Sequence, residues 1–256
     1  MKLIFKYLLV VLLPFVLAGC NSAKLALREQ NWNSQPEYVV QGRQGFTFNQ
    51  KLKFGEFATD KIKRSWTTTK AVSRYYDFSN ITADFIKRHQ AYSFTIQDTA
   101  GRALTISSAI NVAKTDRTWT KGRSASSKFT SSDILKNNLY IIITNPDDES
   151  DLPWQLTLDN NAHYTNQRHA GTLYQTDQDY YYFVPVTKIK GSNGSHQAST
   201  FDVSGYEIFN QDNQPVAAVS LIDKGAVYFK TQAPAERLLL AGVCSALLLQ
   251  PHDIED

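Results

Sequence analysis

The sequence contains few sulfur-bearing residues and no long hydrophobic run. Among its 256 residues there is one methionine, Met1, and there are two cysteines, Cys20 and Cys244. Two cysteines cannot make the disulfide framework that holds many small exported domains together. The two main apolar runs, residues 7–17 and 238–249, are both shorter than the ~20 residues that a helix needs to cross a bilayer. The core must therefore come from branched aliphatic residues and from aromatic residues, which make up 12% of the chain.

The first 19 residues have the pattern of a removable export signal. A basic start with two lysines and no acid precedes the run 7–17, in which Pro14 is the only residue that is neither aliphatic nor aromatic. The run closes on Leu17-Ala18-Gly19-Cys20, which resembles the lipobox of bacterial lipoproteins. This resemblance implies cleavage before Cys20 and attachment of a diacylglycerol to its thiol. The alternative is an ordinary signal peptide that happens to carry a cysteine.

The residues after Cys20 bear on where the protein lies. Asn21 and Ser22 stand where an aspartate would resemble the inner-membrane retention signal of Gram-negative lipoproteins. Its absence favours the outer membrane, so we expect a lipid-anchored protein of the cell envelope that faces the periplasm. Residues 20–35 lack strand alternation and end beside Pro36, which predicts a lipidated tether. Two acyl chains suffice for stable anchoring.

The charge balance does not point to nucleic acid. Removing residues 1–19 removes two lysines and no acid, which leaves 25 basic against 24 acidic residues. A balance this even lacks the excess of positive charge that attracts a phosphate backbone. The expected partner is the membrane itself, through the N-terminal lipid.

From residue 38 onward the dominant pattern is short alternating runs rich in aromatic and β-branched residues, separated by Gly, Asn, Asp and Pro. About a dozen closely spaced strands indicate one mainly β domain over residues 36–256, with mostly antiparallel neighbours. The predicted strands are 38–41, 45–54, 61–68, 92–97, 103–112, 139–144, 154–158, 171–175, 180–187, 201–209, 216–222 and 226–230.

Two short helices and two loops are predicted between these strands. Ile81, Phe85 and Ile86 follow helical spacing over residues 81–89, and a weaker helical pattern covers 132–136. The loops are 121–127 and 191–200, the second of which is rich in Ser, Gly and Asn.

The chain ends in an apolar helix. Pro234 and Pro251 bracket it, which fits the positions that proline prefers around a helix. Residues 238–249 carry no charge, and Ser245 is the one polar side chain among them. A helix that is hydrophobic all round has to be covered on all sides, by a barrel, by a second layer or by an oligomer interface. Cys244 lies within this run and is expected to be a buried, inert thiol.

The last segment combines Gly205-Tyr206-Glu207-Ile208-Phe209, Val216-Ala217-Ala218-Val219-Ser220 and Val227-Tyr228-Phe229 with the apolar helix that follows. This order resembles the C-terminal end of the tubby-like superfamily, which includes tubby domains, phospholipid scramblases and plant LURP-one-related proteins. The resemblance implies a closed barrel of twelve strands around a central hydrophobic C-terminal helix. The alternative is a two-sheet sandwich with the last helix packed under a layer of loops.

No catalytic or metal-binding pattern stands out. His163 and His169 are six residues apart with Asp159 nearby, but this spacing matches no tight zinc site, and two solvated histidines on a loop are the simpler interpretation. The acidic run 147–151 lacks the spacing and the glycine of a calcium-binding EF-hand. The glycine-rich stretch 191–195 is neither a P-loop nor a nucleophile elbow. We therefore expect no cofactor.

Residues 51–74 are the most conspicuous charged feature. Alternation with Leu52, Phe54 and Ile62 places the lysines of this segment on one strand face, opposite the apolar residues. This face is either a soluble outer surface with lysines that protect a sheet edge, or a surface for an anionic ligand such as lipid headgroups or an acidic envelope polymer. The candidate anion-binding residues are Lys51, Lys53, Lys61, Lys63 and Arg64, followed in the chain by Lys70 and Arg74.

Three functional hypotheses follow. The first is a membrane-tethered, non-catalytic binding or structural module of the cell envelope. The second is an envelope enzyme that acts on lipid or glycan through residues around 163–169. The third is a binder of anionic lipid headgroups through the 51–74 face.

Overall fold

The computed structural model describes residues 24–43, 49–76, 81–120, 128–147, 152–163, 167–191, 195–199 and 203–250. The predicted signal 1–19, Cys20, the predicted loop 121–127 and most of the acidic run 147–151 lie outside the described residues.

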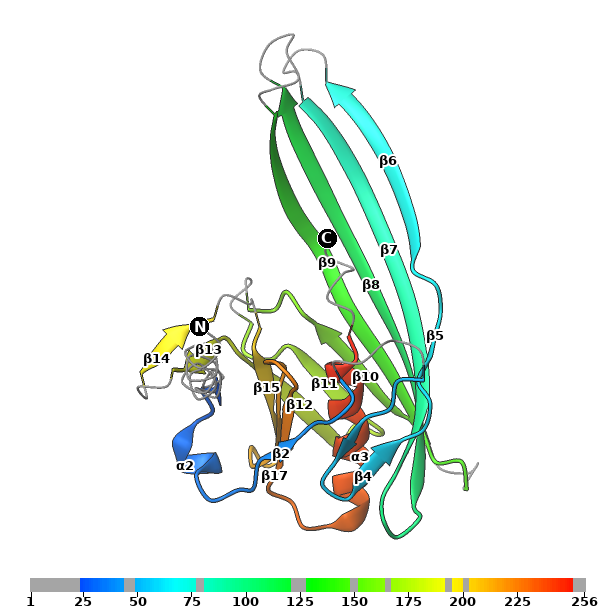
Figure 1. Ribbon diagram of the computed structural model, residues 1–256, viewed down its shortest axis with the longest axis vertical. Helices are drawn as coiled ribbons and strands as arrows, with labels where there is room; N and C mark the ends of the chain where they lie inside the picture. The colour runs from blue at the N-terminus through cyan, green and yellow to red at the C-terminus, as the bar shows by residue number, and fades with distance from the viewer. Residues whose placement is uncertain are drawn as a thin grey trace, which may run out of the picture.

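The main sheet is a barrel of antiparallel strands, as the sequence predicts (Figure 1). Gln41, just after the first strand of the path, pairs with Lys53 in the last one through two backbone hydrogen bonds of 2.9 and 3.1 Å, and this bridge closes the barrel. Around the barrel the strands are β2 (Tyr38–Val39), β17 (Ala226–Phe229), β16 (Pro215–Ser220), β15 (Gly205–Asn210), β12 (Tyr180–Val186), β11 (Gly171–Tyr174), β10 (Trp154–Asp159), β9 (Lys128–Thr144), β8 (Ala103–Thr120), β7 (Ile81–Gln97), β4 (Phe57–Thr59) and β3 (Lys53–Phe54).

The helix α3 (Pro234–Leu248) lies inside this barrel. All of its residues from Leu238 to Leu248 are buried, as expected for a helix that is hydrophobic all round. It contacts β7, β8, β9, β16 and β17. At Gly242 a Cβ atom would lie 3.1 Å from Ile106 Cδ1, so the helix and the barrel wall approach closely there. The closed barrel around the helix replaces the sandwich alternative.

Two arginines and a tyrosine satisfy the C-terminal carbonyl groups of α3. Arg43 Nε donates to the oxygen of Leu248 over 3.0 Å, and Arg64 Nη1 donates to that of Leu249 over 3.1 Å. The hydroxyl of Tyr92 donates to the oxygen of Ala246 over 2.7 Å. The last turn of α3 has no basic residue of its own, so distant arginines supply the positive charge that a helix C-terminus favours.

Four strands run far beyond the barrel (Figure 1). β7 and β8 have 17 and 18 residues, which corresponds to about 60 Å at ~3.3 Å per residue. With β6 (Thr68–Tyr76), which pairs with β7, and with β9 they form a projecting sheet that we call the extension. β5 (Lys63–Arg64) also pairs with β7, closer to the barrel.

The two short helices expected at 81–89 and 132–136 are wrong, because both segments are strands of the extension. Residues 81–89 pair with β6 on one side and with β8 on the other, so their backbone groups are satisfied by a sheet. In β9 the register shifts between Ala113↔Lys136 and Lys114↔Ile134, which leaves Leu135 as an extra, exposed bulge residue. This extra residue interrupts the two-residue alternation of the strand, so the spacing of the apolar residues in 132–136 resembles that of a helix.

Part of the segment predicted as a tether lies on the body. β1 (Lys24–Leu25) pairs with β13 (Lys188–Lys190), which pairs in turn with β14 (His196–Ala198) inside the expected loop 191–200. The short helix α2 (Glu29–Trp32) follows. Residues 24–35 are therefore not a free linker, because β1 and the indole of Trp32 both bind the barrel domain.

Candidate functional site

The exposed lysines between residues 51 and 63 lie together on the outside of the barrel. Leu52, Phe54 and Ile62 are between 0% and 4% exposed in the core, so the alternating lysines Lys51, Lys53, Lys61 and Lys63 are exposed on the outer side. Backbone hydrogen bonds from Thr59 to Leu52 and from Ile62 to Gln50 hold the two short segments side by side. The predicted placement of these lysines on one face is confirmed.

Arg64, which the sequence groups with these lysines, points to the inner side. Its guanidinium donates to the oxygen of Leu249 and to Gln50 Oε1, both over 3.1 Å, and lies over the ring of Tyr92. Burial lowers the pKa of Arg64, and the neighbouring Tyr92 raises it by a smaller amount. Because this side chain caps α3, it does not belong to the outer surface.

The outer face continues along the extension, where further lysine side chains lie on it. Lys63 lies opposite Ser93 of β7, and Lys70 lies opposite Lys87 of the same strand. Because Ser93 and Lys87 are an even number of residues apart, they point to the same face of the sheet. Lys87 faces Ala113 of β8, and Ala113 faces Lys136 of β9, so Lys70, Lys87 and Lys136 form one row across four strands. All three side chains are exposed.

The next rows place aromatic and apolar side chains between the cations. Val72 lies directly opposite Phe85, and the guanidinium of Arg74 sits 5.6 Å from the centre of the Phe85 ring. Further across, Arg117 pairs with Asp133, which neutralises its charge. We call this surface the basic outer face; it comprises Lys51, Lys53, Lys61, Lys63, Lys70, Arg74, Lys87 and Lys136.

Sequence reasoning missed Lys87 and Lys136 as members of this face. Both lie in segments with apparent helical spacing, and only the strand register shows that they align with Lys70. Like charges directly opposite each other on a sheet are destabilising. The pair Lys70 and Lys87 therefore costs stability in the isolated protein, and an anion bound between them would relieve it.

The histidines at 163 and 169 have separate surroundings. His163 Nδ1 lies 3.1 Å from the oxygen of Asn160, within the same turn. The ring of His169 packs edge-on against Tyr182 at 4.3 Å, and burial, followed by the charge of Arg168, lowers its pKa. Asp159 Oδ1 accepts the backbone N–H of Asn161. In the part of the chain that the structure describes, no three His, Cys, Asp or Glu side chains gather as metal ligands would.

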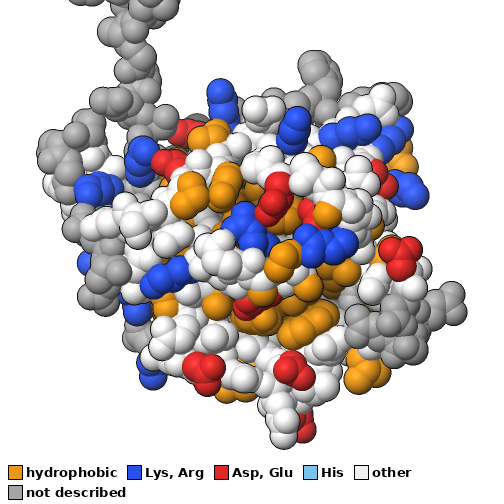
Figure 2. Space-filling model, turned by 90° about the horizontal axis from the view of Figure 1, so that it is seen from below, with side chains coloured by type: hydrophobic (Ala, Val, Ile, Leu, Met, Phe, Trp, Pro, Cys, Tyr) orange, Lys and Arg blue, Asp and Glu red, His pale blue; other side chains and the backbone are white. Residues whose placement is uncertain are grey.

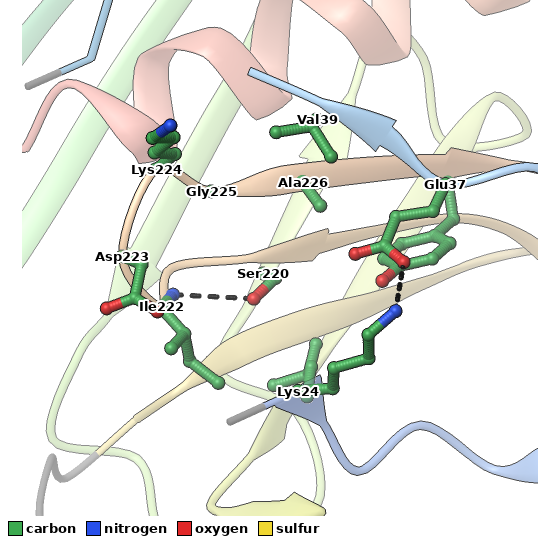
Figure 3. Close-up of a pocket in the computed structure, with 11 residues that line it drawn as sticks. Lys24, Glu37, Val39, Ser220, Ile222, Asp223, Lys224, Gly225 and Ala226 are labelled. Atoms are coloured by element: carbon green, nitrogen blue, oxygen red, sulfur yellow. Dashed lines mark hydrogen bonds and ion pairs between the residues drawn. The ribbon is translucent and has the colours of Figure 1, made fainter. Parts of the chain in front are cut away.

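A hollow of about 450 Å³ lies beside the N-terminal segment (Figure 3). Lys24 Nζ and Glu37 Oε2 form an ion pair of 2.8 Å on one side of it, and Asp223 and Lys224 lie on the other. The hydroxyl of Ser220 accepts the backbone N–H of Ile222. Among the described residues that line the hollow, Ser220 is the one serine, and the hydrogen bond given for its hydroxyl is this one to the backbone.

At the lower end of the barrel, where α3 begins, the described side chains carry charges of both signs. Viewed from below, Lys, Arg, Asp and Glu side chains are mixed among hydrophobic ones (Figure 2). Arg237 pairs with Glu56 over 2.9 Å, and its guanidinium lies 4.8 Å from the centre of the Phe229 ring. Glu236 accepts from the hydroxyl of Tyr181 over 3.0 Å. Arg237 and Glu236 are therefore engaged by other side chains at this end of the barrel.

No protein-family model, no curated protein and no solved structure matches the chain. None of the described helices has the length and apolar character needed to span a bilayer.

Proposed function

We propose that the protein is a non-catalytic binding module of the bacterial cell envelope that takes an anionic ligand on its basic outer face. A lipid on Cys20 holds it at a membrane, which we infer to be the outer membrane, with the domain in the periplasm. The ligand is a surface or chain of repeated negative charge, either anionic lipid headgroups or an acidic envelope polymer.

The row Lys70, Lys87 and Lys136 carries this proposal. Three exposed lysines aligned across four strands repel one another, and a row of this kind gains most from a ligand with several anionic groups. Each lysine near an anionic membrane surface contributes about 1 kcal/mol of attraction. The long, paired strands fix the backbone positions of the row, so binding has to order the lysine side chains but not the backbone that carries them.

The barrel supports this surface as a scaffold. Its interior is filled by α3, whose residues 238–248 are buried. The closed barrel around a C-terminal helix, together with the sequence pattern of residues 205–249, also supports a relationship to the tubby-like superfamily, which we infer from architecture and pattern alone.

The test uses the chain without residues 1–19 and with Cys20→Ser, so that no lipid contributes to binding. Binding is measured to vesicles of phosphatidylglycerol and phosphatidylcholine, to vesicles of phosphatidylcholine alone, and to dextran sulfate. We expect salt-sensitive binding to the anionic probes only. The variant Lys70→Gln/Lys87→Gln should bind them more weakly by roughly 30-fold, from the loss of about 2 kcal/mol.

The matched control is Lys188→Gln/Lys230→Gln, which removes two exposed lysines elsewhere on the protein. Its binding should stay close to that of the parent chain. Equal affinity for neutral and anionic vesicles, with no binding to dextran sulfate, would contradict the proposal, as would equal losses in the two double variants.

A further inference from the structure

The outer surface of β9 to β12 differs from the basic outer face in composition. Four tyrosines point outward from it: Tyr140 on β9, Tyr174 on β11, and Tyr180 and Tyr182 on β12. We call these tyrosines, with the outward residues of β10 and β11 between them, the tyrosine face. Tyr174 is 42% exposed, and the other three are half-buried.

The strand register arranges this surface in two rows. In the first, Ile142, Gln155, Tyr174 and Tyr180 follow one another across the four strands. In the second row, the order is Tyr140, Thr157, Thr172 and Tyr182. Neither row contains a charged side chain, whereas eight lysines and arginines line the basic outer face.

Two of the four tyrosine rings are held in place by their neighbours. Tyr182 stacks on Phe209 with the ring planes 7° apart, and its hydroxyl is hydrogen-bonded to Asn213. The amide of Asn138 donates to the hydroxyl of Tyr140 over 3.2 Å, which leaves the hydroxyl proton of Tyr140 able to donate outward. The rings of Tyr140 and Tyr182 are thus ordered before a ligand arrives, which lowers the entropy cost of binding.

We infer that the tyrosine face is a binding site for an uncharged glycan chain. The apolar C–H faces of a sugar ring stack on the electron-rich faces of aromatic rings. The amide of Gln155 and the hydroxyls of Thr157 and Thr172 lie between the tyrosines, where sugar hydroxyls need hydrogen-bond partners. From β9 to β12 the strands span roughly 14 Å, the reach of a short oligosaccharide.

The same features argue against other ligands. A charged ligand would lose hydration without gaining an opposite charge in these two rows. An extended peptide that binds by strand addition needs a free strand edge, but β10 and β11 are paired on both sides here. This site goes beyond the anion-binding function proposed above, since it uses other residues and another kind of interaction.

The experiment titrates the chain that lacks residues 1–19 and carries Cys20→Ser with two neutral oligosaccharides, chitotetraose and maltotetraose, and follows binding by calorimetry and by NMR. We expect millimolar or tighter binding of at least one of them that does not change with salt. Tyr174→Ala/Tyr180→Ala should weaken it by about tenfold or more, or ~1.4 kcal/mol. Tyr174→Phe, which keeps the ring, should retain most of the affinity.

Tyr75→Ala serves as a control, because Tyr75 is 60% exposed on the extension and outside the tyrosine face. The inference is overturned if neither sugar binds at millimolar concentration, or if Tyr75→Ala weakens binding as much as the double variant does. It is also overturned if Lys70→Gln/Lys87→Gln abolishes sugar binding, because the site would then be the basic outer face. Dimerisation in light scattering that Tyr174→Ala/Tyr180→Ala abolishes would assign the surface to a second copy of the chain and overturn the inference as well.

Discussion

Arg64 donates a hydrogen bond to the carbonyl oxygen of Leu249, which lies 185 residues further along the chain. Arg64 Nη2 also binds Gln50 Oε1, so one guanidinium ties β5, the segment before β3 and the end of the enclosed helix together. A buried carbonyl without a partner costs free energy, and hydrogen bonds to charged donors are the stronger ones.

Replacing Arg64 should therefore destabilise the barrel. We expect Arg64→Ala to lower the free energy of unfolding by about 1–3 kcal/mol, because the carbonyl of Leu249 loses its donor. Arg64→Lys should recover only part of this, since an ammonium group cannot reproduce the planar geometry. Urea unfolding followed by circular dichroism measures the change. Lys63→Ala, next to it but exposed, is the control, and a loss of the same size there would contradict the capping role.

The N-terminal segment should contribute to stability through Trp32. Its indole N–H donates to Glu207 Oε1 over 2.7 Å, and the carboxylate of Glu207 also pairs with Arg28 Nε over 3.2 Å. Trp32→Phe keeps the apolar contact but removes this charged hydrogen bond, so we expect a loss of about 1.5–3 kcal/mol in unfolding free energy. Trp66→Phe changes a tryptophan that is 94% exposed and should stay within about 0.5 kcal/mol. If Trp32→Phe and Trp66→Phe lowered the unfolding free energy by similar amounts, Trp32 would not be the residue that holds the N-terminal segment on the barrel.

The strands of the barrel wall could be predicted from the sequence, and the extension could not. In β9, Leu139, Ile141 and Ile143 are at most 1% exposed and alternate with outward residues. Burial of one face therefore produces the alternation by which the strand can be predicted from the sequence. In the first half of β7, Phe85 is exposed and Ile86 is half-buried. A sheet with two accessible faces needs no apolar alternation, and its residues are free to imitate helical spacing.

The candidate binding surfaces could also be predicted only in part from the sequence. Alternation correctly predicts that Lys63 points outward, because its neighbour Ile62 is buried. It does not show that Lys70, Lys87 and Lys136 form a row, or that Tyr174 lies beside Tyr180. Those relationships depend on the register between strands, which between β8 and β9 is also shifted by the bulge at Leu135. The register between strands cannot be read directly from a single sequence.

The thiol of Cys244 should be inert until the protein unfolds. It lies fully buried in α3, and burial raises its pKa far above the ordinary value, so the reactive thiolate is scarce. In a Cys20→Ser chain, we expect no labelling by a thiol reagent under native conditions and complete labelling in urea. Rapid labelling of the native protein would show that the helix is not enclosed.

Asp98 should contribute stability that depends on pH. Burial alone would raise its pKa, but the hydrogen bonds and charge of Arg102 and the backbone N–H of Ala100 outweigh burial and hold the pKa below its usual range. A depressed carboxyl pKa stabilises the fold above the unfolded pKa, and this contribution is lost as the pH falls through the folded pKa. Asp98→Asn should therefore have a lower melting temperature than the parent at neutral pH, and the difference should shrink in acid. Asp212→Asn, in an exposed turn, is the control for the substitution itself, and an equal fall in melting temperature at neutral pH would contradict the role of Asp98.

The two cysteines should differ completely in lipid attachment. Cys20 precedes Lys24, where β1 begins, by four residues, which in full extension reach at most about 14 Å. A lipid there would hold the small sheet of β1, β13 and β14 close to the membrane. We expect Cys20→Ala to abolish incorporation of labelled palmitate and to release the protein from the membrane fraction, because the lipid that we propose on Cys20 would have no attachment site. Cys244→Ala should retain both properties. Palmitate labelling of Cys20→Ala at the parent level would show that the lipid is attached elsewhere, and the proposed orientation of the barrel at the membrane would then fail.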